Sequence, residues 1–369
     1  MTQTFLYRLI FIVFYIFFDA TAHAKNGSVK VVLVSVASEN DKYWHEIHNL
    51  AKAAAKDLHI DFEILLSESN HLEVIRISKE LTQRETKPDY VILVAEKNAA
   101  SKAIPILNKS GIKVFVFGDM TKEEQKLIGK PRQKYANYIG QLVPDDYLAG
   151  YLTAESMIEN LIKNKRFDQN GNINILAFEG VRRTHFNLER VRGLKDVLKQ
   201  YPQVKLLQSI PTDWTYNYVF NALPLLLKRY DGINIVGVWC VGAQSARASA
   251  DIITSQRLDI LTVGTNWSPL AAQRVNQGDI LSLAGGHVAS VAWILVLLYD
   301  YHNDKDFGSS VFRSEVTLMD KDFSGKYLSY IKNNDWSHID FTRYSKVKNP
   351  KIMAYDFSLN DIINHLEKH

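Results

Sequence analysis

Short apolar runs rich in β-branched residues alternate along this chain with longer amphipathic segments. The first pair covers residues 29–58, where the run VKVVLVSV precedes a polar turn with two aromatic residues. Apolar residues then follow at three- and four-residue steps, at positions 47, 50, 51, 54 and 58. This spacing predicts a strand and then a helix whose apolar stripe lies on a sheet. The turn would lie at the carboxyl end of the first strand, where open α/β sheets bind ligands.

The same unit recurs in two series. The first predicts strands at 62–66, 90–95, 113–117 and 138–139, with helices from Asn70, over 99–108, and from Asp145 or Asp146 to about 162. The charged residues 121–134 interrupt it, which indicates a surface excursion. The second predicts strands at 173–178, 204–210, 233–239, 260–263, 280–283 and 316–319, with helices at 186–200, 216–228, 243–255, 270–276 and 288–299. Strands separated by helices pair in parallel with right-handed crossovers, so the pattern predicts two doubly wound α/β lobes. In the tail after residue 321, helical stretches are expected near 327–332 and 359–366.

Composition agrees with two globular lobes. A chain of 369 residues is too long for one ordinary hydrophobic core, and its 46% hydrophobic content is typical of a well-packed protein. The net charge is only +4, from 44 basic and 40 acidic residues. Because no Lys/Arg stripe is interleaved with aromatic residues, the sequence argues against nucleic-acid binding.

The first residues indicate export. An apolar run from 9 to 18 follows Arg8 and precedes Ala22-His23-Ala24, a pattern typical of a signal peptide at residues 1–24 that is cleaved before Lys25. The run is shorter than the roughly 20 residues that span a bilayer. A buried amino-terminal helix is the alternative. The single cysteine, Cys240, allows no internal disulfide, and no cysteine follows the cleavage site as a lipid anchor would require. We therefore expect a soluble protein of the periplasm.

Catalytic and metal-binding patterns are absent from the sequence. It contains no Gly-x-Gly-x-x-Gly, no phosphate-binding loop, no Gly-x-Ser-x-Gly and no His-Glu-x-x-His. The pairs His45/His48 and His365/His369 have helical spacing but no third ligand nearby, so we expect solvated histidines and no metal or cofactor. If the chain were an enzyme, Asp213 with His287 is the one proton-transfer pair that we can suggest.

Polar and aromatic residues collect instead at the predicted strand ends. Aromatic faces stack on sugar-like rings, and Asp, Asn and Arg hydrogen-bond hydroxyls, so this pattern favours a binding site. For each residue there is a structural alternative, since tryptophans at strand ends are commonly core residues and Arg182 and Arg183 suit a solvated loop. The candidate site residues are Asn40, Asp41, Tyr43, Trp44, Asp119, Arg190, Arg192, Asp213, Trp214, Trp239, Asn266, Trp267 and His287.

From residue 30 to about 319 the chain resembles the periplasmic sugar-binding proteins of the ribose and galactose type, including the autoinducer-2 receptor. The order and spacing of four stretches carry the resemblance: VSVASENDKYW at 34–44, FEG at 178–180 with ERVRG at 189–193, DW at 213–214 and VGTN at 263–266. The resemblance implies two lobes joined by three crossings, here near Gly140, Gly286 and Val316. The amino-terminal lobe would hold 25–140 plus 287–315, and the carboxyl-terminal lobe would hold 141–286 plus 316–369.

The resemblance also implies roles for individual residues. Tyr43 and Trp44 match the paired aromatics that cover the sugar, and Asp41 matches a polar residue just before them. Arg190 matches an arginine at the start of a helix in the second lobe, with Arg192 as the alternative. Trp214 matches a stacking aromatic, and Asn266 stands where an aspartate commonly receives hydroxyls.

Two departures bear on the ligand. The family's Asp-Arg after the fourth strand is Asp119-Met120 here, and its Asn-Asp after a later strand is Cys240-Val241. Because unpaired hydrogen-bonding groups are costly, these changes argue against plain ribose or galactose, and the ligand is expected to be another carbohydrate or a related polar compound. A smaller, more hydrophobic or anionic compound is the alternative, with Arg190 and Arg192 supplying charge. The resemblance implies a non-catalytic, monomeric protein that delivers this ligand to a transporter permease or signals to a sensor kinase. The alternatives are a periplasmic enzyme and a module that binds a sensor kinase without any ligand.

Overall fold

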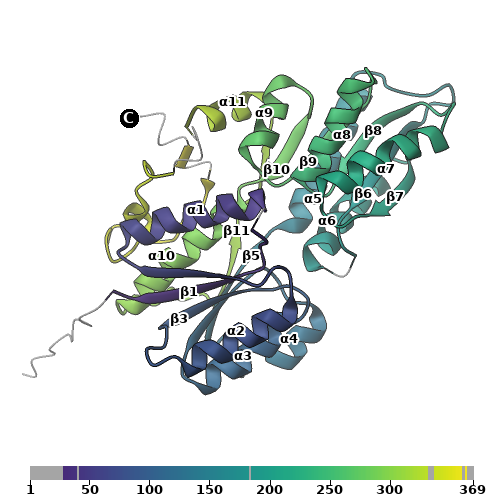
Figure 1. Ribbon diagram of the computed structural model, residues 1–369. Helices are drawn as coiled ribbons and strands as arrows, with labels where there is room; N and C mark the ends of the chain where they lie inside the picture. The colour runs from purple at the N-terminus through teal and green to yellow at the C-terminus, as the bar shows by residue number, and fades with distance from the viewer. Residues whose placement is uncertain (1–27, 40, 183, 331–335, 360–361, 364–369) are drawn as a thin grey trace, which may run out of the picture.

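The computed structural model describes residues 28–39, 41–182, 184–330, 336–359 and 362–363 (Figure 1). The predicted signal peptide, Asn40, Arg183 and the pair His365/His369 lie outside the described residues. The described chain forms two α/β lobes, each built on one six-stranded sheet, which confirms the predicted fold class.

The first lobe has the strand order β11-β5-β4-β3-β1-β2, and every pairing is parallel. Its strands are β1 (Lys30–Ser35), β2 (Asp61–Leu66), β3 (Tyr90–Val94), β4 (Lys113–Phe117), β5 (Tyr138–Pro144) and β11 (Val311–Ser314). The helices α1 (Lys42–Asp57) and α10 (Ser290–His302) cover one face. The helices α2 (His71–Gln83), α3 (Ala99–Lys109) and α4 (Lys122–Ile128) lie on the other face (Figure 1). The apolar stripe predicted for α1 is fully or almost fully buried, as expected.

The second lobe has the order β12-β10-β9-β8-β6-β7, in which only β12 runs antiparallel to its neighbour. Its strands are β6 (Ile173–Glu179), β7 (Val204–Pro211), β8 (Ile235–Cys240), β9 (Leu261–Thr265), β10 (Ser282–Gly285) and β12 (Thr317–Met319). Its helices are α5 (Asp146–Lys163), α6 (His185–Gln200), α7 (Tyr216–Arg229), α8 (Ala243–Ser255) and α9 (Pro269–Gln277).

The chain passes between the sheets after β5, β10 and β11. The first crossing differs from the expected position near Gly140, because β5 stays in the first sheet as far as Pro144. Gly140 has a packing role instead: a Cβ there would lie only 2.4 Å from the ring of Phe115. At the second crossing Gly286 has φ of 112°, and a Cβ there would approach the carbonyl oxygen of Glu315 in the third crossing. The second and third crossings therefore lie side by side.

Two segments differ from the sequence-based expectations. Residues 121–134 are more than a surface excursion, because Thr121 and Glu124 form a capping box that starts α4. The tail begins with helix α11 (Lys321–Tyr330), which packs on the second lobe, but the later part of the tail packs on the first lobe. After residue 336 it packs on α1 and α10 of the first lobe, with a 3-10 turn η3 at Phe341–Tyr344. The boundary that assigned all of 316–369 to the second lobe is therefore corrected.

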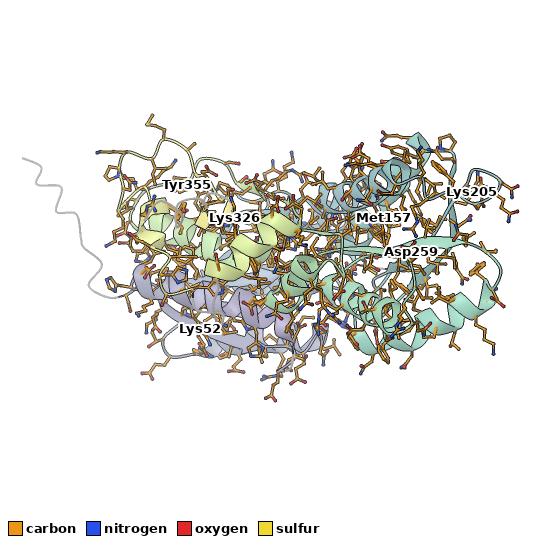
Figure 2. All side chains as sticks on the ribbon, turned by 90° about the horizontal axis from the view of Figure 1, so that it is seen from above. Lys52, Met157, Lys205, Asp259, Lys326 and Tyr355 are labelled. Carbon is orange, nitrogen blue, oxygen red and sulfur yellow. The ribbon has the colours of Figure 1, made fainter. Side chains whose placement is uncertain are left out.

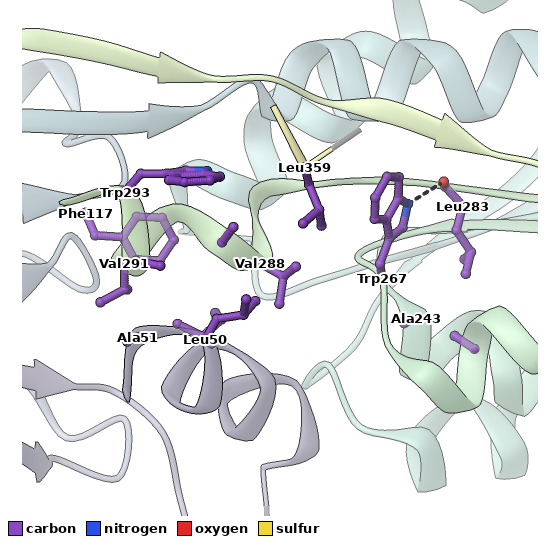
Figure 3. Packing of buried hydrophobic residues seen from close by; sticks show 14 of the residues in the cluster. Leu50, Ala51, Phe117, Ala243, Trp267, Leu283, Val288, Val291, Trp293 and Leu359 are labelled. Atoms are coloured by element: carbon purple, nitrogen blue, oxygen red, sulfur yellow. Dashed lines mark hydrogen bonds between the residues drawn. The ribbon is translucent and has the colours of Figure 1, made fainter. Parts of the chain in front are cut away.

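One apolar cluster connects the two lobes. It includes Leu50 and Trp293 of the first lobe, Val288 after the second crossing, and Trp267 and Ala243 of the second lobe (Figure 3). Helix α10 is buried along almost its whole length, which explains its uniformly apolar sequence. In the described residues no helix is both long and apolar enough to cross a membrane.

Candidate functional site

The first-lobe edge of the candidate site is built by the turn between β1 and α1. Asp41 caps the helix, and its Oδ1 accepts hydrogen bonds from the backbone N–H groups of Tyr43 (3.1 Å) and Trp44 (3.3 Å). Burial raises the pKa of Asp41, although these two hydrogen bonds oppose the shift. The cap places both aromatic residues in the first helical turn. Trp44 packs on Phe117 at the end of β4, and Tyr43 lies with its ring 6.2 Å from that of His287.

Asp119 follows β4 at the same edge and reaches across to the second lobe. Its Oδ2 lies 3.3 Å from Nε2 of His185, at the start of α6. Burial raises the pKa of Asp119, but the hydrogen bond and charge of His185, together with hydrogen bonds from Met120 and Gln141, bring its pKa below the usual value. Burial lowers the pKa of His185, but Asp119 raises it above the usual value. Next to this pair, the ring of Phe186 lies close to Gly118. A Cβ added to Gly118 would be only 2.9 Å from that ring.

The second-lobe edge is organised around the buried guanidinium of Arg190. Its Nε donates to Asp146 (2.7 Å), and its Nη1 donates to the carbonyl of Val241 (2.9 Å) and to the hydroxyl of Thr265 (2.7 Å). Its Nη2 also contacts Asp146, at 2.7 Å. An arginine has five N–H donors, so these four contacts leave one N–H of Nη2 without a partner among the described residues.

Trp214 lies beside Arg190 and closes one side of this edge. The guanidinium carbon of Arg190 is 5.9 Å from the centre of the Trp214 ring, within the range of a cation–π contact. The ring also lies directly over Gly180, where a Cβ would come within 2.3 Å of it. A side chain at position 180 would therefore displace the indole.

His287 completes the site at the second crossing. Its Nε2 lies 2.9 Å from Oδ1 of Asn266, while its buried Nδ1 has no hydrogen-bond partner among the described residues. Burial, and then the nearby charge of Arg190, lower the pKa of His287 to about 3. The ring is therefore neutral near pH 7. Because Oδ1 of Asn266 is an acceptor, Nε2 carries the proton and Nδ1 is a free acceptor.

These groups lie within electrostatic reach of one another. Burial raises the pKa of Tyr43, the charge of Arg190 lowers it and the charge of Asp146 raises it. The charge of Arg190 also lowers the pKa of His287. The structure thus brings together Tyr43, Arg190, His287 and their immediate partners from the first lobe, the second lobe and a crossing.

Four predicted site residues lie elsewhere. Arg192 is exposed on the other side of α6, where it pairs with Glu189 and covers Tyr147. Asp213 is exposed and holds the turn that starts α7. Trp239 and Trp267 are almost fully buried core residues.

The indole N–H groups of these two tryptophans are satisfied internally. Trp239 donates to the hydroxyl of Thr153 (3.0 Å) and Trp267 to the carbonyl of Leu283 (2.9 Å; Figure 3). Both are therefore corrected from ligand contacts to core residues. The pair suggested for an enzyme is not formed either, because the partner of His287 is Asn266 and not Asp213.

Sequence reasoning missed Asp146, Thr265 and His185. Asp146 was considered only as a helix cap, a role that Asp145 takes by accepting from the N–H of Leu148. An acidic residue inside the first turn of a helix, on its buried side, would have indicated a partner charge elsewhere in the lobe.

Other candidate chemistry lies outside this site. A pocket of about 180 Å³ beside the β1–α1 turn is lined by Ala37, Ser38, Glu39, Asp41, His45, His48 and Leu66, all from the first lobe. In the part of the chain that the structure describes, no three His, Cys, Asp or Glu side chains are grouped to hold a metal. Cys240 is fully buried, and burial raises the pKa of its thiol to about 12, which suits a core residue.

Comparison with known proteins gives consistent results. The profile of the periplasmic binding protein domain matches residues 31–305. A crystal structure of a periplasmic sugar-binding protein from Pseudomonas fluorescens is 27% identical, covers 91% of this chain and 99% of its own, and superposes with a TM-score of 0.81. No curated protein matches the chain significantly.

More distant structures share the fold. A galactofuranose binding protein is 18% identical over 83% of this chain and 99% of its own, with a TM-score of 0.70. The arabinose-binding component of an ABC transporter from Shewanella sp. ANA-3, bound to L-arabinofuranose, is 16% identical over 82% of this chain and 96% of its own, with a TM-score of 0.67.

Proposed function

Because this chain belongs to the periplasmic binding protein domain family, a family of binding proteins and not of enzymes, we propose that it binds a small sugar-like ligand between its two lobes. The predicted periplasmic location agrees with the family. We further propose that the mature chain begins at Lys25, after cleavage of the signal peptide, and acts as a monomer.

One observation carries the proposal: polar groups with unused hydrogen-bonding capacity come from the second lobe and from the second crossing. His287 offers a buried acceptor at Nδ1, and Arg190 retains one N–H donor. Adjacent ligand hydroxyls both donate and accept, so a polyol can satisfy the two groups together. A buried polar atom left without a partner costs about 1–3 kcal/mol, and a ligand hydroxyl would remove that cost.

The aromatic residues supply the complementary apolar contacts. Tyr43 and Trp44 come from the first lobe and Trp214 from the second, and a sugar ring has apolar faces on which such side chains stack. The charges at the site are largely compensated, since Arg190 is paired with Asp146 and His287 is neutral. This balance favours an uncharged ligand over an anion.

A thermal-shift screen of residues 25–369 against pentoses, hexoses and furanosides tests the proposal. A ligand at 100 times its Kd stabilises the folded state by about 2.7 kcal/mol, so at least one sugar should raise Tm by several degrees. If none of the sugars in the screen, including galactofuranose, allose and arabinose, raises Tm, the proposal is wrong.

We propose a transporter permease as the membrane partner, in line with the ABC transporter roles named for structural relatives. A sensor kinase is the alternative. Uptake of the radiolabelled ligand by cells that lack this gene separates the two. Loss of uptake supports delivery to a permease, whereas unchanged uptake with altered transcription supports signalling.

A further inference from the structure

The C-terminal tail is anchored first to the second lobe. Helix α11 lies along α9 (Figure 1), and the rings of Phe323 and Tyr327 pack on Trp267 at centroid distances of 5.1 and 5.8 Å. The side chain of Tyr327 is fully buried. Trp267 follows Asn266 of the candidate site directly, so this anchor is part of the rigid second lobe.

The tail is then anchored to the first lobe. The fully buried carboxylate of Asp300, on α10, accepts hydrogen bonds from the backbone N–H groups of Lys346 (2.7 Å) and Val347 (3.3 Å) and from the hydroxyl of Tyr355 (2.8 Å). Phe357 stacks on Trp293 of the same helix, with centroids 5.2 Å apart. The view from above in Figure 2 shows Tyr355 and Lys326 at separate places along this tail.

The part of the tail on the second lobe and the part on the first lobe contact each other at Trp336. Trp336, which is 3% exposed, lies with its ring 6.4 Å from that of Tyr327. Its Nε1 lies 3.4 Å from Oε2 of Glu46, a buried residue of α1. Trp336 therefore contacts Tyr327, which is packed on the second lobe, and Glu46, which belongs to the first.

We propose that the tail is a strap that restrains the angle between the lobes, with Tyr327, Trp336 and Glu46 as its clasp. Binding proteins with hinged lobes open by rigid rotation of one lobe against the other. Such a rotation changes the position of Tyr327 relative to Trp336 and exposes buried aromatic surface. Because this exposure costs free energy, the clasp resists opening. The strap is a fourth connection in addition to the three crossings.

Distance measurements on the ligand-free protein test the strap. Spin labels at Lys102→Cys on α3 and Lys228→Cys on α7 report the separation of the lobes, since both positions are exposed and Cys240 is buried. In the Trp336→Ala variant the population at longer distances should rise at least about twofold. Identical distance distributions for the Trp336→Ala protein and the protein with wild-type Trp336 would overturn the proposal.

Two control variants distinguish an effect on the angle between the lobes from a general loss of folding stability. Phe341→Ala removes a buried tail aromatic that packs on Trp293 and whose backbone N–H is bonded by Asp57 of α1, both in the first lobe, so it should lower Tm and leave the distances unchanged. Tyr327→Phe removes a hydroxyl that has no hydrogen-bond partner among the described residues, and it should leave the distances unchanged.

If Trp336→Ala does not fold, Tyr327→Ala tests the same clasp from the second lobe. Equal widening by Phe341→Ala and by the clasp variants would show that the tail acts through stability alone and would contradict the strap. The measurement requires no ligand, so its outcome is independent of the proposed function.

Discussion

The first-lobe and second-lobe edges of the candidate site are organised in different ways. At the second-lobe edge the polar groups bond mainly to one another: Arg190 binds Asp146, Thr265 and the carbonyl of Val241, all within one lobe. At the first-lobe edge the partners are divided: Asp41 caps its own helix, whereas Asp119 accepts a hydrogen bond from Gln141 of the first lobe and also pairs with His185 of the second lobe. The second-lobe edge therefore does not depend on the angle between the lobes, whereas the first-lobe edge is completed only when the lobes approach each other.

This difference predicts where stability and binding separate. Changes at the second-lobe edge should unfold that lobe, because they leave buried charges without partners. Changes at the first-lobe edge should leave the fold nearly intact and affect the cleft. The following predictions are ordered from the largest effect to the smallest.

Arg190→Leu should have the largest effect on folding. It leaves the carboxylate of Asp146 buried and unpaired, which destabilises a protein by about 3–5 kcal/mol. Urea unfolding measures the loss. The double variant Asp146→Leu/Arg190→Leu removes both charges and should recover much of the stability. A loss below about 1 kcal/mol in the single variant would mean that the edge is not held by this ion pair.

Trp44→Ala should affect ligand binding more than folding. Trp44 is only partly buried and packs on Phe117 and His48, whereas Trp239 is fully buried. We expect a loss of about 2 kcal/mol or more in binding, as for aromatic residues at the centre of an interface. Calorimetry and urea unfolding of the same variant compare the two losses. Equal losses would assign Trp44 to the core.

The Asp119–His185 pair should make a small, pH-dependent contribution to stability. The pKa of His185 is raised on folding, so its contribution is present below the unfolded value near 6.5 and is lost as the pH rises through the folded value. The pKa of Asp119 is lowered, so its contribution is present above about 3.9 and is lost as the pH falls through the folded value. The pair therefore contributes most between about pH 4 and 6.5.

His185→Gln tests this pH window. The variant should cost up to about 1 kcal/mol at pH 5.5 and progressively less as the pH rises from about 6.5 through the folded pKa of His185. Unfolding free energies measured across this range give the profile. A cost that does not change with pH would mean that His185 contributes through packing and not through charge.

The sequence predicted the two lobes because strand and helix periodicities are local signals. It placed Tyr43 and Trp44 at the end of β1 because a strand, a polar turn and a helix follow one another directly there, whereas their contact with a ligand stays a prediction. It left Arg190 and Arg192 as alternatives, although the buried positions 187, 190, 191, 194 and 197 of α6 form one helical stripe that includes only Arg190. Helical periodicity could therefore have decided between them.

The other errors depend on contacts between distant parts of the chain. Trp239 and Trp267 stand at strand ends like Trp214, and only the tertiary partners Thr153 and Leu283 identify them as core residues. The tail resembles an extension of the second lobe until Asp300 binds its backbone from the first lobe. Local patterns carry no information on such partners.

The central claim is that the cleft binds a sugar-like ligand through the free acceptor of His287. Calorimetric titration of the wild-type protein and of His287→Leu with a sugar that raises Tm tests it most directly, with Arg192→Ala as the matched control outside the cleft. We predict saturable binding by the wild-type protein and by Arg192→Ala, and at least about fivefold weaker binding by a folded His287→Leu, since an unpaired hydroxyl costs about 1–3 kcal/mol. Equal affinity of His287→Leu and the wild-type protein would contradict the account.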